Sequence, residues 1–190
     1  MTSLKKNIGL LGGTFDPPHQ GHLSISKHSL IKLGLDEVWW IVSKKNPLKK
    51  ENSKYELRLA ETKKFLYSQK IKVFEVNDEL ENIYTIDLIM YLKKKFPKFF
   101  FIWLMGADNL KQFHLWKDWR KIFYNIPIAI FDRPFYSLDL LQSKAFSFFR
   151  NKRIDNKYAK SIKYMIPPKW VFLTGINNPQ SSTNIRLNKK

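Results

Sequence analysis

Short apolar runs alternate with amphipathic stretches along the whole chain. The apolar runs predict strands at 8–12, 37–42, 71–76, 99–105, 127–132 and 170–174. Helical patterns lie between them, near 21–33, 53–68, 85–95, 116–124, 138–149 and 158–164, and a last one starts near 182. Continuous apolar strands that alternate with helices are typical of a parallel sheet covered on both faces. The pattern therefore predicts an α/β, Rossmann-like doubly wound parallel sheet, in a single domain of residues 1–190 with a short C-terminal helix.

Composition narrows the class of protein further. A hydrophobic content of 44% and an aromatic content of 15% exclude a mainly disordered chain. The chain has no cysteine, which excludes disulfides, thiolate nucleophiles and cysteine metal sites. The longest apolar run, 99–107, is too short to span a bilayer, and the run that ends at Gly12 is too short for a signal peptide. We expect a soluble cytoplasmic protein.

The net charge of +18 raises the question of a nucleic-acid partner. Only six of the 34 basic residues are Arg, and the Lys residues are spread along the whole chain. Surfaces that read bases favour Arg for its bidentate fork, so the charge alone does not indicate such a surface. A basic nucleic-acid-binding module stays open as an alternative, while the expectation here is no nucleic-acid and no membrane partner.

The loops that follow the strands are where ligands bind in open parallel sheets. They are predicted at 12–22, 43–50, 77–84, 106–116, 132–137 and 175–181. Most of the unusual residues of the chain fall in these loops, so we expect the functional site at the carboxyl edge of the sheet.

The first of these loops, "GGTFDPPHQGH" at residues 12–22, is unusually rich in special residues. Gly12 and Gly13 let the backbone lie against a ligand, because no Cβ stands in the way. His19 and His22 are three residues apart where a helix begins, so both imidazoles share its first turn. Free amides at a helix N-terminus favour phosphate oxygens. The stretch fits neither the dinucleotide nor the P-loop pattern, and it indicates a polyphosphate site of another kind.

This stretch resembles the first motif of the nucleotidyltransferase superfamily, and most closely that of the bacterial nicotinate-nucleotide adenylyltransferases. Further motifs agree in order and cover essentially the whole chain: "NPLK" (46–49), "RLA" (58–60), "YTIDL" (84–88), "GADNL" (106–110), Trp116, "RP" (133–134) and "SSTNIR" (181–186). The chain departs from the family at Gln180, where Ile is frequent, and at Ser43, where Pro is common.

The resemblance implies that one half of the site binds ATP. His19, His22 and Arg186 would be the catalytic residues, and Asp16 would brace the first loop. Ser182 and Thr183 would begin a second phosphate-binding helix. The ATP-binding set implied by the family is Gly12, Gly13, Thr14, Phe15, His19, His22, Ser182, Thr183 and Arg186.

The other half would bind nicotinate mononucleotide. Trp116 would stack on the pyridine ring, amides at Tyr84 and Thr85 would hold its carboxylate, and Asp108 would take ribose hydroxyls. The full set implied is Asn46, Lys49, Tyr84, Thr85, Asp108, Trp116 and Arg133. His28 and His114 have no motif support and are expected to be packing or surface residues.

The implied reaction joins nicotinate mononucleotide and ATP to give deamido-NAD and pyrophosphate, by direct in-line attack. The attacking phosphate is already anionic, since its second pKa is about 6, so no protein nucleophile is needed. Mg²⁺ would be held mainly through substrate phosphates, without a protein ligand cage. A different phosphate-ester acceptor, such as phosphopantetheine, stays open within the class. The sequence leaves the oligomeric state open and is compatible with a homo-oligomer.

Overall fold

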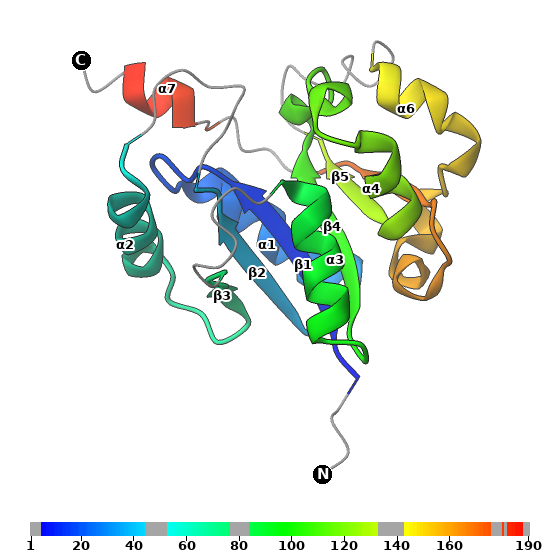
Figure 1. Ribbon diagram of the computed structural model, residues 1–190, viewed down its shortest axis with the longest axis horizontal. Helices are drawn as coiled ribbons and strands as arrows, with labels where there is room; N and C mark the ends of the chain where they lie inside the picture. The colour runs from blue at the N-terminus through cyan, green and yellow to red at the C-terminus, as the bar shows by residue number, and fades with distance from the viewer. Residues whose placement is uncertain are drawn as a thin grey trace.

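Among the residues that the structure describes, six strands form one parallel sheet (Figure 1). This computed structural model describes residues 5–44, 53–76, 84–132, 143–175, 180 and 182–187, without the side chains of 183, 184 and 187. The strands are β1 (Asn7–Gly13), β2 (Glu37–Val42), β3 (Ile71–Val73), β4 (Phe100–Gly106), β5 (Ile128–Phe131) and β6 (Trp170–Leu173). Their order is β3-β2-β1-β4-β5-β6, and every neighbouring pair is parallel. The predicted Rossmann-like α/β sheet is confirmed.

Helices connect the strands. The α-helices are α1 (Gln20–Lys32), α2 (Tyr55–Phe65), α3 (Thr85–Lys95), α4 (Trp119–Asn125), α6 (Lys144–Phe148) and α7 (Ser182–Leu187). Short 3-10 helices are η1 (Ala107–Asn109), η2 (Phe113–Leu115), η3 (Arg150–Lys152) and η4 (Asn156–Tyr164). All six predicted strands are present, and a helix lies within every predicted helical stretch.

Each face of the sheet carries its own apolar core. One core joins Trp39, Phe101 and Trp103 to apolar residues of α3, α4 and α6. The other joins Trp40 and Leu104 to residues of α1, α2 and η4. In Figure 1, α3 and α4 lie in front of the sheet and α1 lies behind it. Burial on both faces explains why the strands read as continuous apolar runs instead of alternating ones.

Several element boundaries differ from the sequence prediction for local reasons. The helix predicted at 116–124 begins only at Trp119, because Asp118 adopts the left-handed conformation, with φ of 50°. The stretch at 158–164 is a 3-10 helix, and the side chain of Asp155 accepts a hydrogen bond from Lys157 N at 2.9 Å at its start. The third strand ends at Val73, where its pairing with β2 stops. Of the helix predicted at 138–149, only the part from 143 onward lies within the described residues.

The strand order reverses between β1 and β4, and a reversal of this kind is where ligands bind in open parallel sheets. The chain runs from β1 outward to β2 and β3, then returns to β4 on the other side of β1 and continues to β6. In such sheets, ligands bind beyond the carboxyl ends of the two central strands. The loops after β1, β2 and β4 and the start of α3 therefore meet at one place.

Candidate active site

The loop after β1 is held in an unusual conformation. Phe15 has a φ of 47°, in the left-handed region that a bulky residue rarely adopts. Its side chain is fully buried and stacks on Trp40, with ring centroids 4.8 Å apart. The carboxylate of Asp16 is also buried and accepts hydrogen bonds from Ser53 N at 3.1 Å and Ser53 Oγ at 2.8 Å. Asp16 thus joins this loop to the segment before α2, which is the bracing role predicted for it.

His19 and His22 form a reciprocal cap at the N-terminus of α1. The Nδ1 atom of His19 accepts from Gly21 N at 3.1 Å, and the Nδ1 atom of His22 accepts from His19 N at 3.2 Å. The two rings stack with centroids 3.8 Å apart. Because Nδ1 accepts a hydrogen bond in both rings, the neutral imidazoles carry their proton on Nε2. In each neutral ring the Nε2–H donor then lies on the edge away from the capping contact.

Gly21 has to be glycine for this cap to form. A Cβ at Gly21 would lie 2.8 Å from Cε1 and 2.9 Å from Nδ1 of His19. Gly12, near the end of β1, must be glycine for a similar reason. A Cβ at this position would lie 2.5 Å from Cη2 of Trp103. Gly12 and Gly21 therefore make room for neighbouring protein rings. The predicted reason for glycine in this motif was instead the close approach of a ligand to the backbone.

The short helix α7 returns the C-terminal part of the chain to the first loop. The hydroxyl of Ser182 donates to the carbonyl of Pro17 at 3.0 Å, and the side chain is buried. Nη1 of Arg186 donates to the carbonyl of Asp16 and lies 3.9 Å from its Oδ2. In Figure 1, α7 lies near the upper end of β1, close to the top of α2. The two phosphate motifs predicted from the sequence are thus brought together.

A buried arginine, Arg58 of α2, lies beside the same loop. Its guanidinium donates to the carbonyls of Thr14 at 2.7 Å, Ser53 at 2.9 Å and Lys44 at 3.1 Å, and the residue is 1% exposed. Burial lowers the pKa of Arg58 below its ordinary value, and the charge of Asp16 opposes this shift. Arg58 belongs to the "RLA" motif, but no role was predicted for it. Nothing in the sequence pattern indicates that this arginine is buried, because a charged residue on an amphipathic helix is ordinarily exposed.

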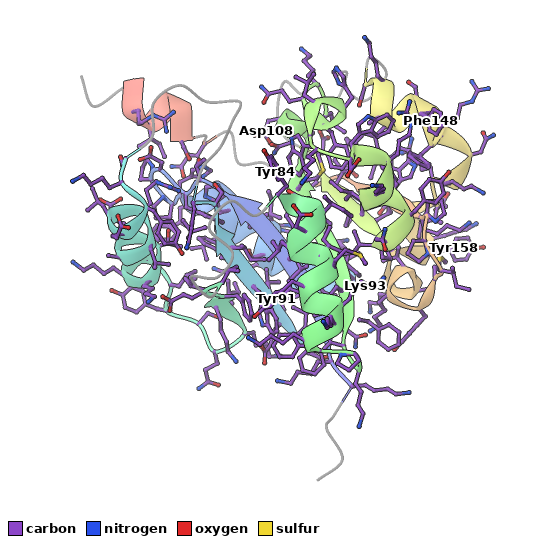
Figure 2. All side chains as sticks on the ribbon, in the orientation of Figure 1. Tyr84, Tyr91, Lys93, Asp108, Phe148 and Tyr158 are labelled. Atoms are coloured by element: carbon purple, nitrogen blue, oxygen red, sulfur yellow. The ribbon has the colours of Figure 1, made fainter. Side chains whose placement is uncertain are left out.

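Those residues predicted for the mononucleotide that the structure describes come from the start of α3 and from the segments that follow β4. Figure 2 shows Tyr84 and Asp108 at the same end of the molecule, above α3. Asp108 lies in η1, directly after β4, and Tyr84 is the N-cap of α3 without a side-chain capping bond. Trp116 follows η2 and packs its ring against Trp103 and Phe113, with centroids 6.0 and 4.8 Å away.

Lys117, next to Trp116, spans from the 113–118 loop to α3. Its Nζ lies 4.4 Å from the ring centroid of Tyr84 and 3.3 Å from Oδ2 of Asp87. The ammonium of Lys117 therefore lies beside the first turn of α3, paired with the carboxylate of Asp87 in that turn. The free amides of such a turn favour anions. The side chains of both Lys117 and Asp87 are about half exposed.

Three buried polar atoms near these loops have no hydrogen-bond partner in the described part of the chain. They are Oγ of Ser43, Nε1 of Trp103 and Nδ1 of His114. Ser43 follows β2, Trp103 lies against Gly12, and His114 belongs to η2. Buried polar groups are nearly always paired in folded proteins, so unpaired ones concentrate where a protein does more than fold. Their position agrees with a site at this edge of the sheet.

Several predicted site residues lie outside the described part. These are Asn46, Lys49 and Arg133, together with the side chain of Thr183. Within the described residues, no group of three or more His, Cys, Asp or Glu side chains could hold a metal ion. None of the helices described is both long and apolar enough to cross a membrane.

Comparison with known proteins agrees with this geometry. The family described as cytidylyltransferase-like matches residues 10–188. The chain is 41% identical over 185 residues to a probable nicotinate-nucleotide adenylyltransferase of Agrobacterium fabrum, covering 96% of this chain and 99% of that protein. It is 38% identical over 181 residues to the probable nicotinate-nucleotide adenylyltransferase of Brucella suis, covering 94% and 93%.

A solved structure has the same fold. The nicotinic acid mononucleotide adenylyltransferase of Plasmodium falciparum, complexed with NaAD, superposes with a TM-score of 0.70 at 20% identity. The match covers 96% of this chain and 83% of that one. At this identity the likeness supports the fold, while the sequence relatives support the family. The chain belongs to the cytidylyltransferase-like family and, within it, to the nicotinate-nucleotide adenylyltransferases.

Proposed function

We propose that this protein transfers the adenylyl group of ATP to nicotinate mononucleotide, giving deamido-NAD and pyrophosphate in NAD biosynthesis. The observation that carries the proposal is the pair of capping imidazoles, His19 and His22, at the N-terminus of α1 beside the end of β1. Two N–H donors at a helix N-terminus suit a polyphosphate. The sequence relatives named above supply the choice of reaction.

The reaction needs positioning more than it needs a protein nucleophile. A 5′-phosphate oxygen of the mononucleotide attacks the α-phosphorus of ATP, and the bond from that phosphorus to the bridging oxygen of the β-phosphate breaks. Pyrophosphate leaves with the electron pair. The attacking oxygen is anionic at neutral pH, because the second pKa of a phosphomonoester is about 6. The protein must therefore hold two anions together and stabilise the charge that grows on the leaving group.

In the proposed site, the loop after β1, the start of α1 and α7 would bind ATP. The Nε2–H donors of His19 and His22 would contact ATP phosphates, alongside the amides of Thr14 and Phe15. Gly12 and Gly13 would let the loop approach the nucleotide, while Ser182, Thr183 and Arg186 would contact the outer phosphates. Mg²⁺ would neutralise phosphate charge and would be held mainly through ATP, because the carboxylate of Asp16 is already engaged by Ser53.

The mononucleotide half follows from α3 and the loop after β4. The ring of Trp116 would stack on the pyridine, and the amides at Tyr84 and Thr85 would hold the carboxylate. Asp108 would accept from ribose hydroxyls. Asn46, Lys49 and Arg133 complete the proposed set from loops outside the described residues. We further propose one nucleotidyltransferase domain over residues 1–190 that works in the cytoplasm, as a monomer or a homo-oligomer.

A coupled pyrophosphate-release assay tests the function. The purified full chain is given ATP and Mg²⁺ with nicotinate mononucleotide, nicotinamide mononucleotide or phosphopantetheine as the acceptor. We expect rapid release with the first acceptor and slow release with the other two. If turnover is fastest with phosphopantetheine, nicotinate mononucleotide is not the preferred acceptor and the proposed reaction is wrong in its acceptor. No turnover with any acceptor, together with salt-sensitive binding of DNA or RNA, would favour a nucleic-acid-binding module instead.

A further inference from the structure

Arg58 stands out because the hydrogen bonds of its buried guanidinium go to backbone carbonyls, while its Cζ atom also lies 5.8 Å from the ring centroid of Tyr55. Its Nε, Nη1 and Nη2 atoms each donate to a different carbonyl, those of Ser53, Thr14 and Lys44. These carbonyls come from the segment before α2, the loop after β1 and the loop after β2. Within the described residues, no carboxylate lies at ion-pair distance from this guanidinium, although Asp16 is near enough to influence its pKa. A buried charge that only supported the fold would ordinarily be paired with an opposite charge.

We propose that Arg58 is a positioning residue for catalysis, which sets the phosphate-binding loop in the conformation that receives ATP. The inference rests on the proposed function. Arg58 would act through the backbone of Thr14 and Phe15, without touching the nucleotide itself.

The planarity of the peptide bond supplies the mechanism. The bond between Thr14 and Phe15 is trans, so its C=O and N–H point in opposite directions. The 2.7 Å hydrogen bond from Arg58 fixes the Thr14 carbonyl toward α2. The Phe15 N–H is thereby directed to the side of the loop away from Arg58. The amide that would contact a phosphate is thus oriented by a residue 44 positions further along the chain.

The strain at Phe15 explains why such a clamp is needed. A non-glycine residue in a sparsely populated backbone region is strained and persists only where its surroundings hold it. Three contacts hold Phe15 in this loop: the hydrogen bond from Arg58 to Thr14, the stacking on Trp40, and the bonds from Ser53 to Asp16. Without Arg58, the peptide before Phe15 is free to rotate toward a relaxed conformation, and its amide turns away.

The shape of the guanidinium is as important as its charge. Arg presents its donors in a rigid planar fork, whereas the ammonium of Lys is a compact point charge. An ammonium in this place keeps the buried positive charge but cannot reach carbonyls of three separate segments with the same geometry. An Arg58→Lys variant therefore separates the positioning of the loop from the electrostatic attraction of phosphate.

The test compares Arg58→Lys with Thr62→Val, a matched control one turn further along α2. Thr62 is fully buried, and its Oγ1 donates only to the carbonyl of Arg58 at 2.7 Å, away from the loop. Both variants of the full chain are assayed well below their melting temperatures. For Arg58→Lys we expect KM for ATP to rise about tenfold and kcat to fall, with KM for the mononucleotide within twofold of wild type. For Thr62→Val we expect a lower Tm and unchanged values of kcat and both KM.

Two further measurements keep every outcome decisive. If Arg58→Lys does not fold, Arg58→Met replaces it, because removal of the buried charge lightens the cost of folding; its KM for ATP should rise at least as much. If wild type shows no turnover, the proposed function fails, and the dissociation constant for ATP then tests Arg58 by itself. The inference is overturned if the Arg58 variant handles ATP like wild type. It is also overturned if Thr62→Val changes KM for ATP equally, or if both substrates weaken together.

Discussion

At the scale of single residues, the side chains of His19 and His22 would each have two tasks. Each side chain caps the start of α1, and each is proposed to contact a phosphate of ATP. Their Nδ1 atoms satisfy backbone amides at the start of α1, a task that Ser, Thr or Asp usually performs. The same contacts fix the tautomer, so the proton on Nε2 is set by the fold. A ring with protons on both nitrogens would turn an N–H toward a backbone N–H and break the cap. We propose that the Nε2–H of each ring is the group that contacts phosphate.

The substitution His22→Gln should separate these two tasks. Gln at the third helical position of a capping box still accepts a hydrogen bond from the N-cap amide, but it lacks the Nε2–H of the ring. We expect kcat to fall by about a hundredfold or more, as on removal of an oxyanion donor, while Tm stays within a few degrees of wild type. Steady-state kinetics and a thermal melt measure both.

His28→Gln on the same helix provides the control for this prediction. The Nδ1 atom of His28 contacts the carbonyl of Ser24 at 2.8 Å, away from the site. Its kcat should match wild type. A normal kcat in folded His22→Gln would show that the ring has no catalytic part.

At the scale of elements, the strands were predictable and the helix boundaries less so. Parallel strands that are buried on both faces are continuous apolar runs in the sequence, and all six strands were predicted from such runs. Helix starts depend on single backbone conformations such as that of Asp118, which composition does not reveal. The 3-10 form of 156–164 likewise has the same amphipathic spacing as an α-helix over its short length.

The position of Arg186 in α7 leads to a prediction about the binding of ATP. Arg186 contacts Asp16, so it lies next to the loop that would hold the triphosphate. We expect Arg186→Ala to raise KM for ATP and to lower kcat, while KM for the mononucleotide changes little. Arg186→Lys should recover only part of the loss, because it lacks the planar fork. An equal increase in both KM values would mean that Arg186 supports the fold.

Glu37 in β2 contacts Lys6, just before β1, and Lys72 in β3. Its pKa predicts how the stability of the protein depends on pH. Burial alone would raise the pKa of Glu37, but hydrogen bonds from Lys6, Trp39 and Lys72 outweigh it and lower the pKa from 4.5 to about 2. Lys6 lies 2.7 Å and Lys72 3.2 Å from Oε1. A lowered pKa stabilises the fold fully above the unfolded value of 4.5, and this contribution is lost as pH falls toward 2.

We expect this carboxylate to contribute about 3 kcal/mol to the free energy of unfolding at neutral pH. Urea melts of wild type and Glu37→Gln at several pH values measure it. The two proteins should differ most at pH 7 and converge between pH 4.5 and 2. A difference that does not change with pH would show that the charge of Glu37 is not the stabilising feature.

At the scale of the whole molecule, the site is assembled from segments that are distant in sequence. Arg186 meets Asp16 across 170 positions, and Arg58 meets Thr14 across 44. Motifs such as 12–22 could be recognised because their residues are unusual by themselves. Arg58 and Ser53 could not, because a buried arginine on an amphipathic helix looks like any exposed one until the fold shows what surrounds it.

The two halves of the assembled site should also discriminate between mononucleotides. The start of α3 offers amides, and the ammonium of Lys117 lies beside Tyr84, where it also pairs with Asp87. In the proposed site a nicotinate carboxylate would accept from those donors, whereas the amide group of nicotinamide would set its NH₂ against them. Unpaired buried donors cost about 1–3 kcal/mol, and lost charge attraction adds to this. We therefore expect kcat/KM for the nicotinate form to exceed that for the nicotinamide form by at least about a hundredfold.

Trp116 tests whether this preference arises at α3 or in the stacking. Both pyridine rings can stack on an indole, so Trp116→Ala should weaken both mononucleotides by similar factors and leave their ratio intact. Lys117→Met should instead lower kcat/KM for the nicotinate form and leave the nicotinamide form nearly unchanged, while Lys121→Met, whose ammonium pairs with Asp118 at 3.1 Å, should change neither. The measurement is kcat/KM for each mononucleotide at saturating ATP and Mg²⁺. Comparable values for the two forms in wild type would remove the deamido assignment but leave adenylyl transfer in place, because the residues proposed to hold the phosphates of ATP differ from those proposed to hold the pyridine ring.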